Sequence, residues 1–312
     1  MTLQQLEYVV AVDTCRHFAK AAEACFVSQP TLSMMIQKLE EELGVKLFDR
    51  RRQPVVPTEI GEAVVGHARK VLQEMHRIPE VVADLKSTIS GVLRLGIIPT
   101  LAPYLIPLFL ESFLKRYPAV KLVITEMITP QIAEKLKQDK LDAGLLVTPL
   151  LDNAITERPL FYERLWVYTS ASEKAYRKKY VLASDIDPDH LWLLEEGHCL
   201  RSQIMNLCEL KRSSRLEQQL DYEAGGLETL MRMVESNNGL TVLPELATLT
   251  LTRSQKKKLR PFKEPVPARE VSLVTHRDFV KSRLVEALKD SITMHLPPSL
   301  LENRRVRTIK IQ

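Results

Sequence analysis

The apolar residues of the first 43 positions recur at helical spacing and predict three helices. They return every three or four positions in residues 3–15, and residues 18–25 hold four alanines that allow close packing. The third helix begins at Ser28-Gln29-Pro30, because Ser28 or Gln29 fits the cap and Pro30 fits the first turn, and it ends at Gly44. Its apolar stripe consists of Leu32, Ile36, Leu39 and Leu43. Two helices joined by a tight turn, the second with a polar face, predict a helix-turn-helix, and residues 47–54 predict a hairpin or wing.

A heptad pattern follows this segment. Its apolar positions are separated alternately by four and three residues: Val64, Ala68, Val71, Met75, Ile78, Val82, Leu85 and Ile89. Such a narrow, sustained seam predicts a helix that pairs with the same helix of a second copy. The alternative is one amphipathic helix packed on its own core. Pro79 falls inside the seam, and we expect it to kink or break the helix.

After Gly91 the pattern alternates between strands and helices. Strands are predicted at 92–98, 120–126, 143–147, 165–170, 191–194, 220–223, 240–243 and 271–275. Helices are predicted at 104–116, 131–138, 227–235 and 280–294. This alternation indicates βαβ units and a mostly parallel sheet.

Length and composition limit the class of protein. A chain of 312 residues is long enough for two or three domains. It contains no run of 18 apolar residues and no signal peptide is visible, so we expect a cytoplasmic protein with no membrane partner. Four cysteines in a chain of this length do not make a disulfide framework. No metal-binding or nucleotide-binding motif occurs, so we expect no metal and no cofactor.

The charge is unevenly distributed. The net charge is +5, but residues 1–90 hold 11 basic and 12 acidic side chains, whereas residues 253–312 hold 15 and 6. The overall charge therefore does not support DNA binding by the N-terminal part; only the cluster Arg50-Arg51-Arg52 does. The basic C-terminal surplus is interpreted as a solvated face and tail.

The most distinctive chemistry lies in the run 195–208. Cys199 stands between His198 and Arg201, and positive charge near a thiol favours the thiolate. Cys208 follows nine positions later and could resolve whatever the first cysteine forms. If the segment between them is helical, the two Cα atoms lie about 13 Å apart. A disulfide requires about 7 Å, so the bond could not form without remodelling.

The N-terminal 60 residues resemble LysR-type transcriptional regulators. The matching residues are Phe18, Ala21, Ala22, Val27, Ser28, Gln29, Pro30, Thr31, Leu32, Ser33, Ile36, Leu39, Glu40, Leu43, Gly44, Leu47, Phe48, Arg50, Thr58 and Gly61. The resemblance continues past Gly91, and residues 194–201, 227–230 and 239–244 are similar to peroxide-sensing members of that family.

The resemblance implies an α/β chain in three parts. Residues 1–60 are expected to form a winged helix-turn-helix, residues 61–90 a long linker helix for dimerisation, and residues 91–312 a redox-sensing effector domain. That domain would consist of two lobes like a periplasmic binding protein. Lobe I would comprise about 91–163 and 268–296, and lobe II about 164–267.

The resemblance also assigns roles to individual residues. Cys199 would attack hydrogen peroxide and become a sulfenic acid, and Cys208 would condense with it to a disulfide. The groups that bind peroxide or tune the thiol would be Thr100, Thr129, His198, Arg201 and Arg269. The remodelled domain would then activate antioxidant genes together with RNA polymerase, as a homodimer or tetramer.

Several alternatives stay open at this point. The two cysteines could be ordinary buried thiols, the two threonines could cap strand ends, and His198 could be structural. The chain could also be a LysR-type regulator of a small organic effector, with incidental cysteines. A thiol peroxidase is a third possibility, but the helix-turn-helix and the linker helix speak against an enzyme.

On the DNA side, the polar face of the third helix would contact promoter DNA. The candidate DNA-binding residues are Ser28, Gln29, Pro30, Thr31, Ser33, Gln37, Arg50, Arg51 and Arg52. Of these, Gln29, Thr31, Ser33 and Gln37 could meet base edges, whereas the three arginines and the helix N-terminal amide near Ser28 would meet phosphates. The alternative for that face is plain solvent exposure. The dimer contacts would come from Val64, Ala68, Val71, Met75, Ile78 and Val82.

Overall fold

The computed structural model describes residues 1–85, 89–208, 224–277, 279, 282–301 and 306–308. The chain divides into two compact units, Met1–Ser87 and Thr88–Gln312, and each is described by itself. The predicted strand at 220–223 lies outside the described residues. Within the described part, no helix is long and apolar enough to cross a lipid bilayer.

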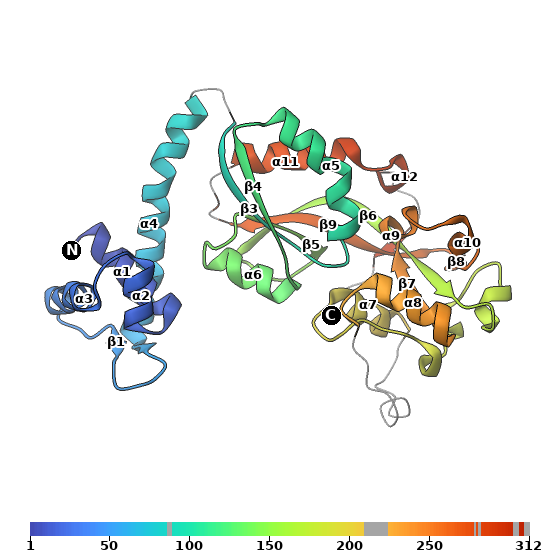
Figure 1. The fold of residues 1–312 in the computed structure, drawn as a ribbon, viewed down its shortest axis with the longest axis horizontal. Helices are drawn as coiled ribbons and strands as arrows, with labels where there is room; N and C mark the ends of the chain where they lie inside the picture. The colour runs from blue at the N-terminus through green and yellow to red at the C-terminus, as the bar shows by residue number, and fades with distance from the viewer. Residues whose placement is uncertain (86–88, 209–223, 278, 280–281, 302–305, 309–312) are drawn as a thin grey trace. The chain divides into compact units, whose positions relative to one another are not determined.

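The first unit is a helix-turn-helix followed by a small hairpin and a long helix (Figure 1). Its elements are α1 (Leu3–Cys15), α2 (Phe18–Ala24), α3 (Gln29–Leu43), β1 (Phe48–Asp49), β2 (Val56–Pro57) and α4 (Glu59–Leu85). The predicted boundaries of α3 are confirmed: Ser28 caps it through the Thr31 N–H at 3.3 Å, and Gly44 ends it with a left-handed φ of 69°. The antiparallel pair of β1 with β2 confirms the predicted hairpin.

The core of this unit lies under the apolar stripe of α3. Leu32, Ile36 and Leu39 are fully buried, and each side chain contributes about 1.5–3 kcal/mol by leaving water. The fourth predicted member, Leu43, is 40% exposed, so its assignment to the stripe is wrong. It is the last residue of the helix, where the chain already turns away from the core.

Helix α4 presents two apolar faces. Ala68 and its neighbours Val65 and Leu72 are buried in the core of their own unit, and Val64 and Met75 pack partly against that core. Val71 and Ile78 instead are 45% and 65% exposed. The side chain of Val82 is outside the described ones. Dimerisation stays a prediction, which now rests on the exposed pair.

Pro79 does not end this helix. α4 runs without interruption from Glu59 to Leu85, so a break at Pro79 is wrong, and the alternative, a kink, stays a prediction. A proline removes one backbone donor from the ladder, but a helix of 27 residues retains its hydrogen bonds on either side of that position.

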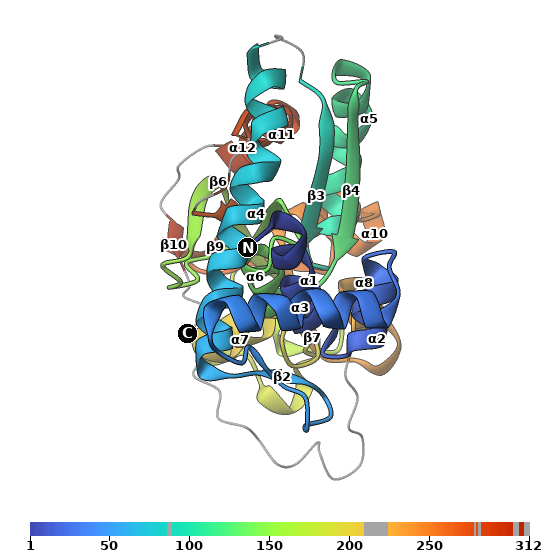
Figure 2. The same ribbon diagram turned by 90° about the vertical axis from the view of Figure 1, so that its left-hand side faces the viewer.

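The described residues of the second unit form an α/β structure around an eight-stranded sheet (Figures 1 and 2). Its strands are β3 (Gly91–Ile97), β4 (Val120–Glu126), β5 (Ala143–Thr148), β6 (Ile155–Thr169), β7 (Leu240–Pro244), β8 (Leu259–Pro261), β9 (Val266–His276) and β10 (Val306–Thr308). The strand order is β4-β3-β5-β9-β6-β7, with β10 beside β9 and β8 beside β6. In Figure 1, α5 (Ala102–Arg116) and α11 (Ser282–His295) cover one face of the β3–β5 region, and α6 (Thr129–Lys137) covers the other.

The remaining helices lie around the β6–β7 region and the C-terminal part. They are α7 (Cys199–Leu207), α8 (Leu227–Asn237), α9 (Glu245–Leu249), α10 (Arg253–Lys256) and α12 (Pro298–Leu301), with short 3₁₀ turns at Lys174–Arg177, Ala183–Asp185 and Pro188–His190. The predicted strand at 191–194 is wrong. Leu191 and Leu194 each form only an isolated bridge, to Leu240 and Ala224 respectively.

The sheet is mixed and not mostly parallel, which corrects the prediction. β3 pairs in parallel with β4 and β5, as βαβ units require. However, β9 inserts between β5 and β6 and runs antiparallel to both. The residues of β9 lie 104 to 121 positions after their partners in β6, so local alternation could not reveal the direction of β9.

β6 and β9 are the longest strands and join the two parts of the sheet. The first part of β6 pairs with β9, from Ile155 opposite His276 to Arg164 opposite Ala268. Its last part, from Leu165 to Thr169, pairs with β7, and within it Trp166 to Tyr168 also pair with β8. Glu163 and Arg269 face each other across the pair just before this change of partner.

Candidate functional site

Cys199 is the first residue of α7, directly after the N-cap His198. Its side chain is 8% exposed and therefore nearly inaccessible to bulk solvent. The preceding Gly197 has a φ of +95°, which side chains other than glycine rarely adopt, so the sharp entry into α7 depends on it. All four cysteines are free thiols.

Thr129 contacts the sulfur directly. Its Oγ1 lies 2.9 Å from Cys199 Sγ, and either atom can be the donor. Thr129 is the first residue of α6, so the N-termini of two helices meet at this contact. Helix N-termini favour negative charge, which suits a sulfur that passes through a thiolate.

Arg269 is the cation whose charge acts on this thiol. Its side chain is fully buried, and Nη1 donates to Thr100 Oγ1 at 3.0 Å while Nη2 donates to the Thr100 carbonyl at 3.3 Å. Thr100, also buried, lies in the turn between β3 and α5. The structure thus places Thr129 against Cys199 and Thr100 against Arg269, whose charge acts on the thiol, although these residues are far apart in the sequence.

The pKa of Cys199 lies above its usual value, which corrects the expectation of a resting thiolate. Burial raises this pKa by removing the charged form from water, and burial outweighs the opposing effects. The hydrogen bond with Thr129 and the positive charge of Arg269 lower the pKa only in part. The resting group is therefore a protonated thiol, already next to the groups that stabilise its ionised form.

His198 and Arg201 are turned toward other partners. His198 Nε2 lies 3.3 Å from Glu195 Oε1, and Arg201 Nη1 donates to the Leu194 carbonyl at 2.8 Å. Neither side chain is a cause of the pKa shift of Cys199. Arg201 is two positions further along α7 than Cys199, so it points roughly 200° away around the axis, and His198 is the N-cap, whose backbone is extended and outside the helix.

Cys208 follows the last residue of α7 and caps the helix. Its backbone N–H donates to the Ile204 carbonyl at 3.0 Å, and burial raises the pKa of its thiol to about 11. The segment between the two cysteines is helical, which meets the condition on which the distance argument depends. Nine residues at about 1.5 Å each place the Cα atoms about 13 Å apart, beyond the roughly 7 Å that a disulfide allows.

Sequence reasoning missed Glu163. This carboxylate is fully buried; its Oε2 accepts from Arg269 Nε at 2.8 Å, and its Oε1 accepts from the Leu246 N–H at 2.7 Å. Burial raises the pKa of Glu163, while Arg269 and the Leu246 N–H oppose that rise. Both oxygens accept N–H donors, so the geometry fits the ionised carboxylate. Its strand, β6, also contains Glu157, Arg158 and Arg164, so no local signal in the sequence singled out Glu163.

The DNA-facing candidates of the first unit divide into two sets. Ser28, Gln29, Pro30, Thr31 and Gln37 are exposed along α3, whereas Ser33 is half-buried. Arg51 and Arg52 are exposed on the hairpin. Gln37 donates to Glu41 at 2.9 Å, which leaves its amide oxygen for a base edge.

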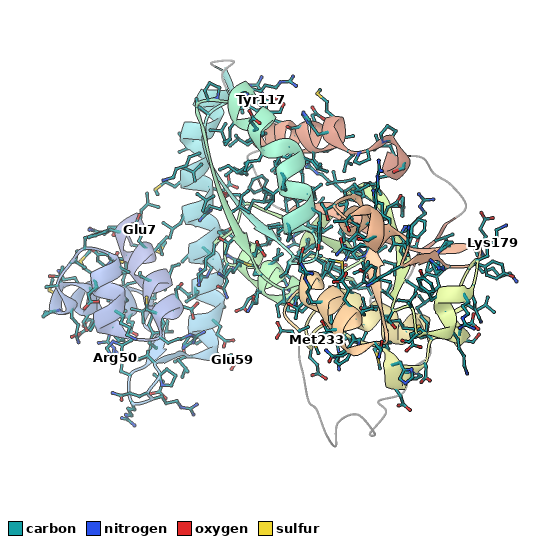
Figure 3. All side chains as sticks on the ribbon, turned by 45° about the vertical axis from the view of Figure 1, so that its right-hand side comes forward. Glu7, Arg50, Glu59, Tyr117, Lys179 and Met233 are labelled. Atoms are coloured by element: carbon teal, nitrogen blue, oxygen red, sulfur yellow. The ribbon has the colours of Figure 1, made fainter. Side chains whose placement is uncertain are left out.

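Arg50, labelled in Figure 3, is tied into its own domain. Its Nη1 donates to Ser33 Oγ at 2.9 Å, and its guanidinium lies 4.8 Å from the centre of the Phe18 ring. Its Nη2 also lies 3.4 Å from Glu40, a buried carboxylate that accepts from the Leu47 N–H. Arg50 thus connects the hairpin to α3, and Ser33 shares in that connection.

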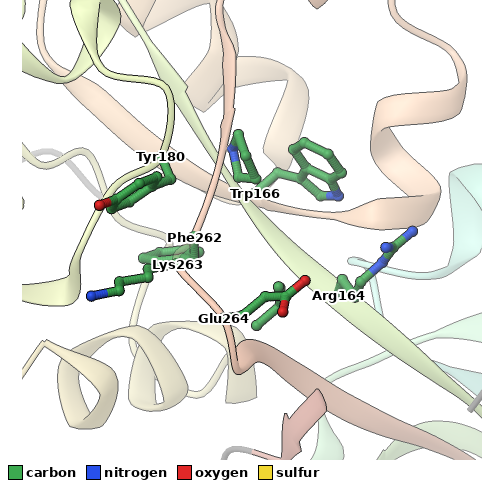
Figure 4. A pocket seen from close by; sticks show the side chains of 8 residues that line it. Arg164, Trp166, Tyr180, Phe262, Lys263 and Glu264 are labelled. Carbon is green, nitrogen blue, oxygen red and sulfur yellow. The ribbon is translucent and has the colours of Figure 1, made fainter. Parts of the chain in front are cut away.

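A separate cavity of about 280 Å³ lies against β6 and β8. Arg164 and Trp166 come from β6, and Phe262, Lys263 and Glu264 come from the segment after β8 (Figure 4). None of the predicted site residues lines it. Among the described residues, no group of His, Cys, Asp or Glu could hold a metal ion.

The chain is similar over most of its length to known regulators. The hydrogen peroxide-inducible genes activator of Pectobacterium carotovorum subsp. carotovorum is 35% identical over 296 residues, which cover 95% of this chain and 97% of that protein. The DNA-binding transcriptional dual regulator OxyR of Escherichia coli K12 is 36% identical over 274 residues, which cover 88% of this chain and 89% of that protein.

Solved structures and family models agree with these relatives. A full-length OxyR variant from Pseudomonas aeruginosa matches with a TM-score of 0.76 and 34% identity, covering 95% of this chain and 99% of that one. Residues 3–62 match the bacterial regulatory helix-turn-helix protein model of the lysR family, and residues 86–297 match the LysR substrate binding domain. The chain therefore belongs to the LysR family of DNA-binding transcriptional regulators.

Proposed function

We propose that this chain is a hydrogen-peroxide-sensing transcription regulator in which Cys199 is the reacting group and Cys208 resolves it. The observation that carries the proposal is the contact of the Cys199 sulfur with Thr129, beside the buried Arg269 and Thr100. The names of the relatives support the same signal.

The chemistry is a two-electron oxidation of the thiol. The sulfur attacks one peroxide oxygen, an S–O bond forms and the O–O bond breaks, so that sulfur is oxidised and peroxide is reduced to water. The proton that leaves the thiol must reach the departing oxygen. Thr129 Oγ1, 2.9 Å from Sγ, is placed to accept that proton and to pass on its own. The charge of Arg269 would stabilise the negative charge that develops during the transfer.

The second step would convert oxidation into a change of shape. The Cys208 thiol attacks the Cys199 sulfenic acid, an S–S bond forms and water leaves. Because about 13 Å of intact helix separates the two Cα atoms, α7 must unwind before or during this step. We infer that the remodelled unit alters contacts between copies of the chain, in a homodimer or tetramer bound to promoter DNA, and so changes the recruitment of RNA polymerase.

Mass spectrometry of the Cys199–Cys208 linkage before and after dilute peroxide tests this proposal. We expect the linkage in the oxidised wild type and its absence in Cys199→Ser, which should also lose the peroxide-dependent change in a promoter footprint. A footprint of Cys199→Ser that still responds to peroxide would refute the assignment. Cys15→Ser is the matched control, since Cys15 lies in the separate first unit.

The proposal includes a regulatory role and no peroxidase activity. A sensor needs to react once per activation, whereas a peroxidase turns over many times. We expect no sustained peroxide consumption when the wild type is supplied with a thiol reductant. A steady turnover rate that depends on Cys199 would instead favour an enzyme.

A further inference from the structure

We propose that Glu163 is a positioning residue for the reaction at Cys199, because its carboxylate orients the guanidinium of Arg269 against Thr100. The inference rests on the proposed peroxide reaction and adds a residue that does not touch the sulfur. Its basis is the geometry of a buried ion pair at the junction of β6 and β9.

The guanidinium is held along two edges. On one edge, Nε donates to Glu163 Oε2 at 2.8 Å, and Nη2 lies 2.8 Å from the same oxygen. On the other edge, Nη1 and Nη2 donate to the hydroxyl and the carbonyl of Thr100. A guanidinium is a planar fork with five N–H donors, so fixing one edge fixes the direction of the other.

This arrangement leaves one donor available. Nη1 carries two N–H groups, and within the described part of the chain its contacts account for one of them, to Thr100 Oγ1. The remaining donor is on the same nitrogen, at the Thr100 end of the guanidinium. Arg269 is also the cation whose charge acts on Cys199. We therefore expect this remaining N–H to donate to the oxygen of a peroxide molecule that approaches the sulfur.

Three features of the structure hold the Glu163 carboxylate in place. It is fully buried, it is the cross-strand partner of Arg269, and its second oxygen accepts from the Leu246 N–H at the start of α9. The other ionisable groups that act on the pair are Glu245 on α9 and Tyr104 on α5. Glu245 is occupied by a two-point contact with Arg164, and Tyr104 donates to Glu228. Among the described residues, Glu163 is therefore the carboxylate that Arg269 contacts.

A purely structural ion pair makes a different prediction. If Glu163 only joined β6 to β9, its loss would lower stability and change every reaction of Cys199 alike. If it positions Arg269, its loss would slow the reaction with peroxide, in which charge develops on a leaving oxygen. Alkylation of the same thiol by iodoacetamide also depends on the thiolate population that Arg269 raises, but it needs no donor for a leaving oxygen. The ratio of the two rates therefore isolates the effect of that donor.

The test compares both reactions in the full-length reduced protein. Rates of Cys199 oxidation by hydrogen peroxide and of Cys199 alkylation by iodoacetamide are measured by peptide mass spectrometry across pH, in wild type, Glu163→Gln and Glu163→Asp. Glu163→Asp keeps the charge and withdraws the carboxylate by one methylene, so it remains informative where Glu163→Gln does not fold. Glu245→Gln is the matched control, since it also removes a buried carboxylate from an arginine.

We expect the ratio of the peroxide rate to the alkylation rate to fall roughly 10- to 100-fold in both Glu163 variants, the scale of a misplaced group at a reacting centre. The ratio should stay within about twofold of wild type in Glu245→Gln. An unchanged ratio in Glu163→Asp overturns the inference, and so does an equal fall in Glu245→Gln. A wild-type Cys199 that reacts with peroxide no faster than a free thiol would overturn the proposed function as well, so the two failures are distinguishable.

Discussion

Replacing Thr129 with valine removes the hydroxyl that contacts the Cys199 sulfur and keeps nearly the same side-chain volume. The hydroxyl lowers the pKa of Cys199, so its loss should raise that pKa further. Thr129 and Cys199 are 7% and 8% exposed, so water can replace little of the lost interaction. A hydrogen bond to a charged group contributes about 1.5–3 kcal/mol. The thiolate population of Thr129→Val at neutral pH should therefore fall about 10- to 100-fold.

The assay is the pH dependence of Cys199 oxidation by hydrogen peroxide, followed by quenched-flow mass spectrometry. Below the pKa the rate tracks the thiolate population, so the rate at neutral pH should fall by the same factor and the profile should move to higher pH. Thr148→Val serves as the control, since Thr148 is also buried but donates to Glu270 at 2.7 Å. A Thr129→Val protein with the wild-type profile and rate would refute the reasoning that this hydroxyl activates the sulfur.

Three further predictions concern resolution, assembly and DNA binding. The rate at which Cys208 condenses with oxidised Cys199 should rise with pH around the ordinary thiol pKa of about 8.5, because α7 must open before the two residues meet. A midpoint near 11 in the stopped-flow pH profile, the pKa of Cys208 in the intact helix, would contradict that opening. Val71→Glu with Ile78→Glu should abolish the proposed dimer in sedimentation without loss of helicity, since both side chains are exposed in the single chain. A dimer that persists in this variant would place the interface elsewhere. Arg51→Ala with Arg52→Ala should weaken binding to all duplexes about equally and reduce the salt slope by about 2; a loss confined to a selected operator sequence would show base reading instead of phosphate contact.

The helices of the first unit could be predicted from the sequence because their signals are local. Ser28 as the cap, Pro30 in the first turn and Gly44 at the end of α3 all act within a few residues of their own position. The role of Arg50 could not be predicted in the same way. Its contacts with Ser33 and Glu40 join residues 17 and 10 positions apart. The sequence of the basic cluster therefore did not reveal that Arg50, rather than Arg51 or Arg52, forms contacts within its own domain.

The strands of the second unit were only partly predictable. Leu165–Ser170 and Val271–Thr275 were recognised because their residues are mostly apolar. The upstream parts of β6 and β9 contain Glu163 and Arg269, whose charges interrupt the apolar pattern. Each buried charge is stabilised by the opposite charge of its cross-strand partner. Because the two residues are 106 positions apart, the sequence around either one gives no sign of this pairing.

The sequence by itself determined the helix-turn-helix, the alternating α/β pattern and the two cysteines at the ends of one helix, because propensity, capping and periodicity act between neighbours. It also pointed through resemblance to Thr100, Thr129 and Arg269. Only the tertiary structure decided which charge acts on Cys199. His198 and Arg201 are adjacent in sequence but turned to other partners, whereas Arg269 arrives 70 residues later through β9. The tertiary structure also decided the protonation state of Cys199. Burial raises the pKa of this thiol and keeps it protonated at rest, and the degree of burial depends on all the residues packed around it.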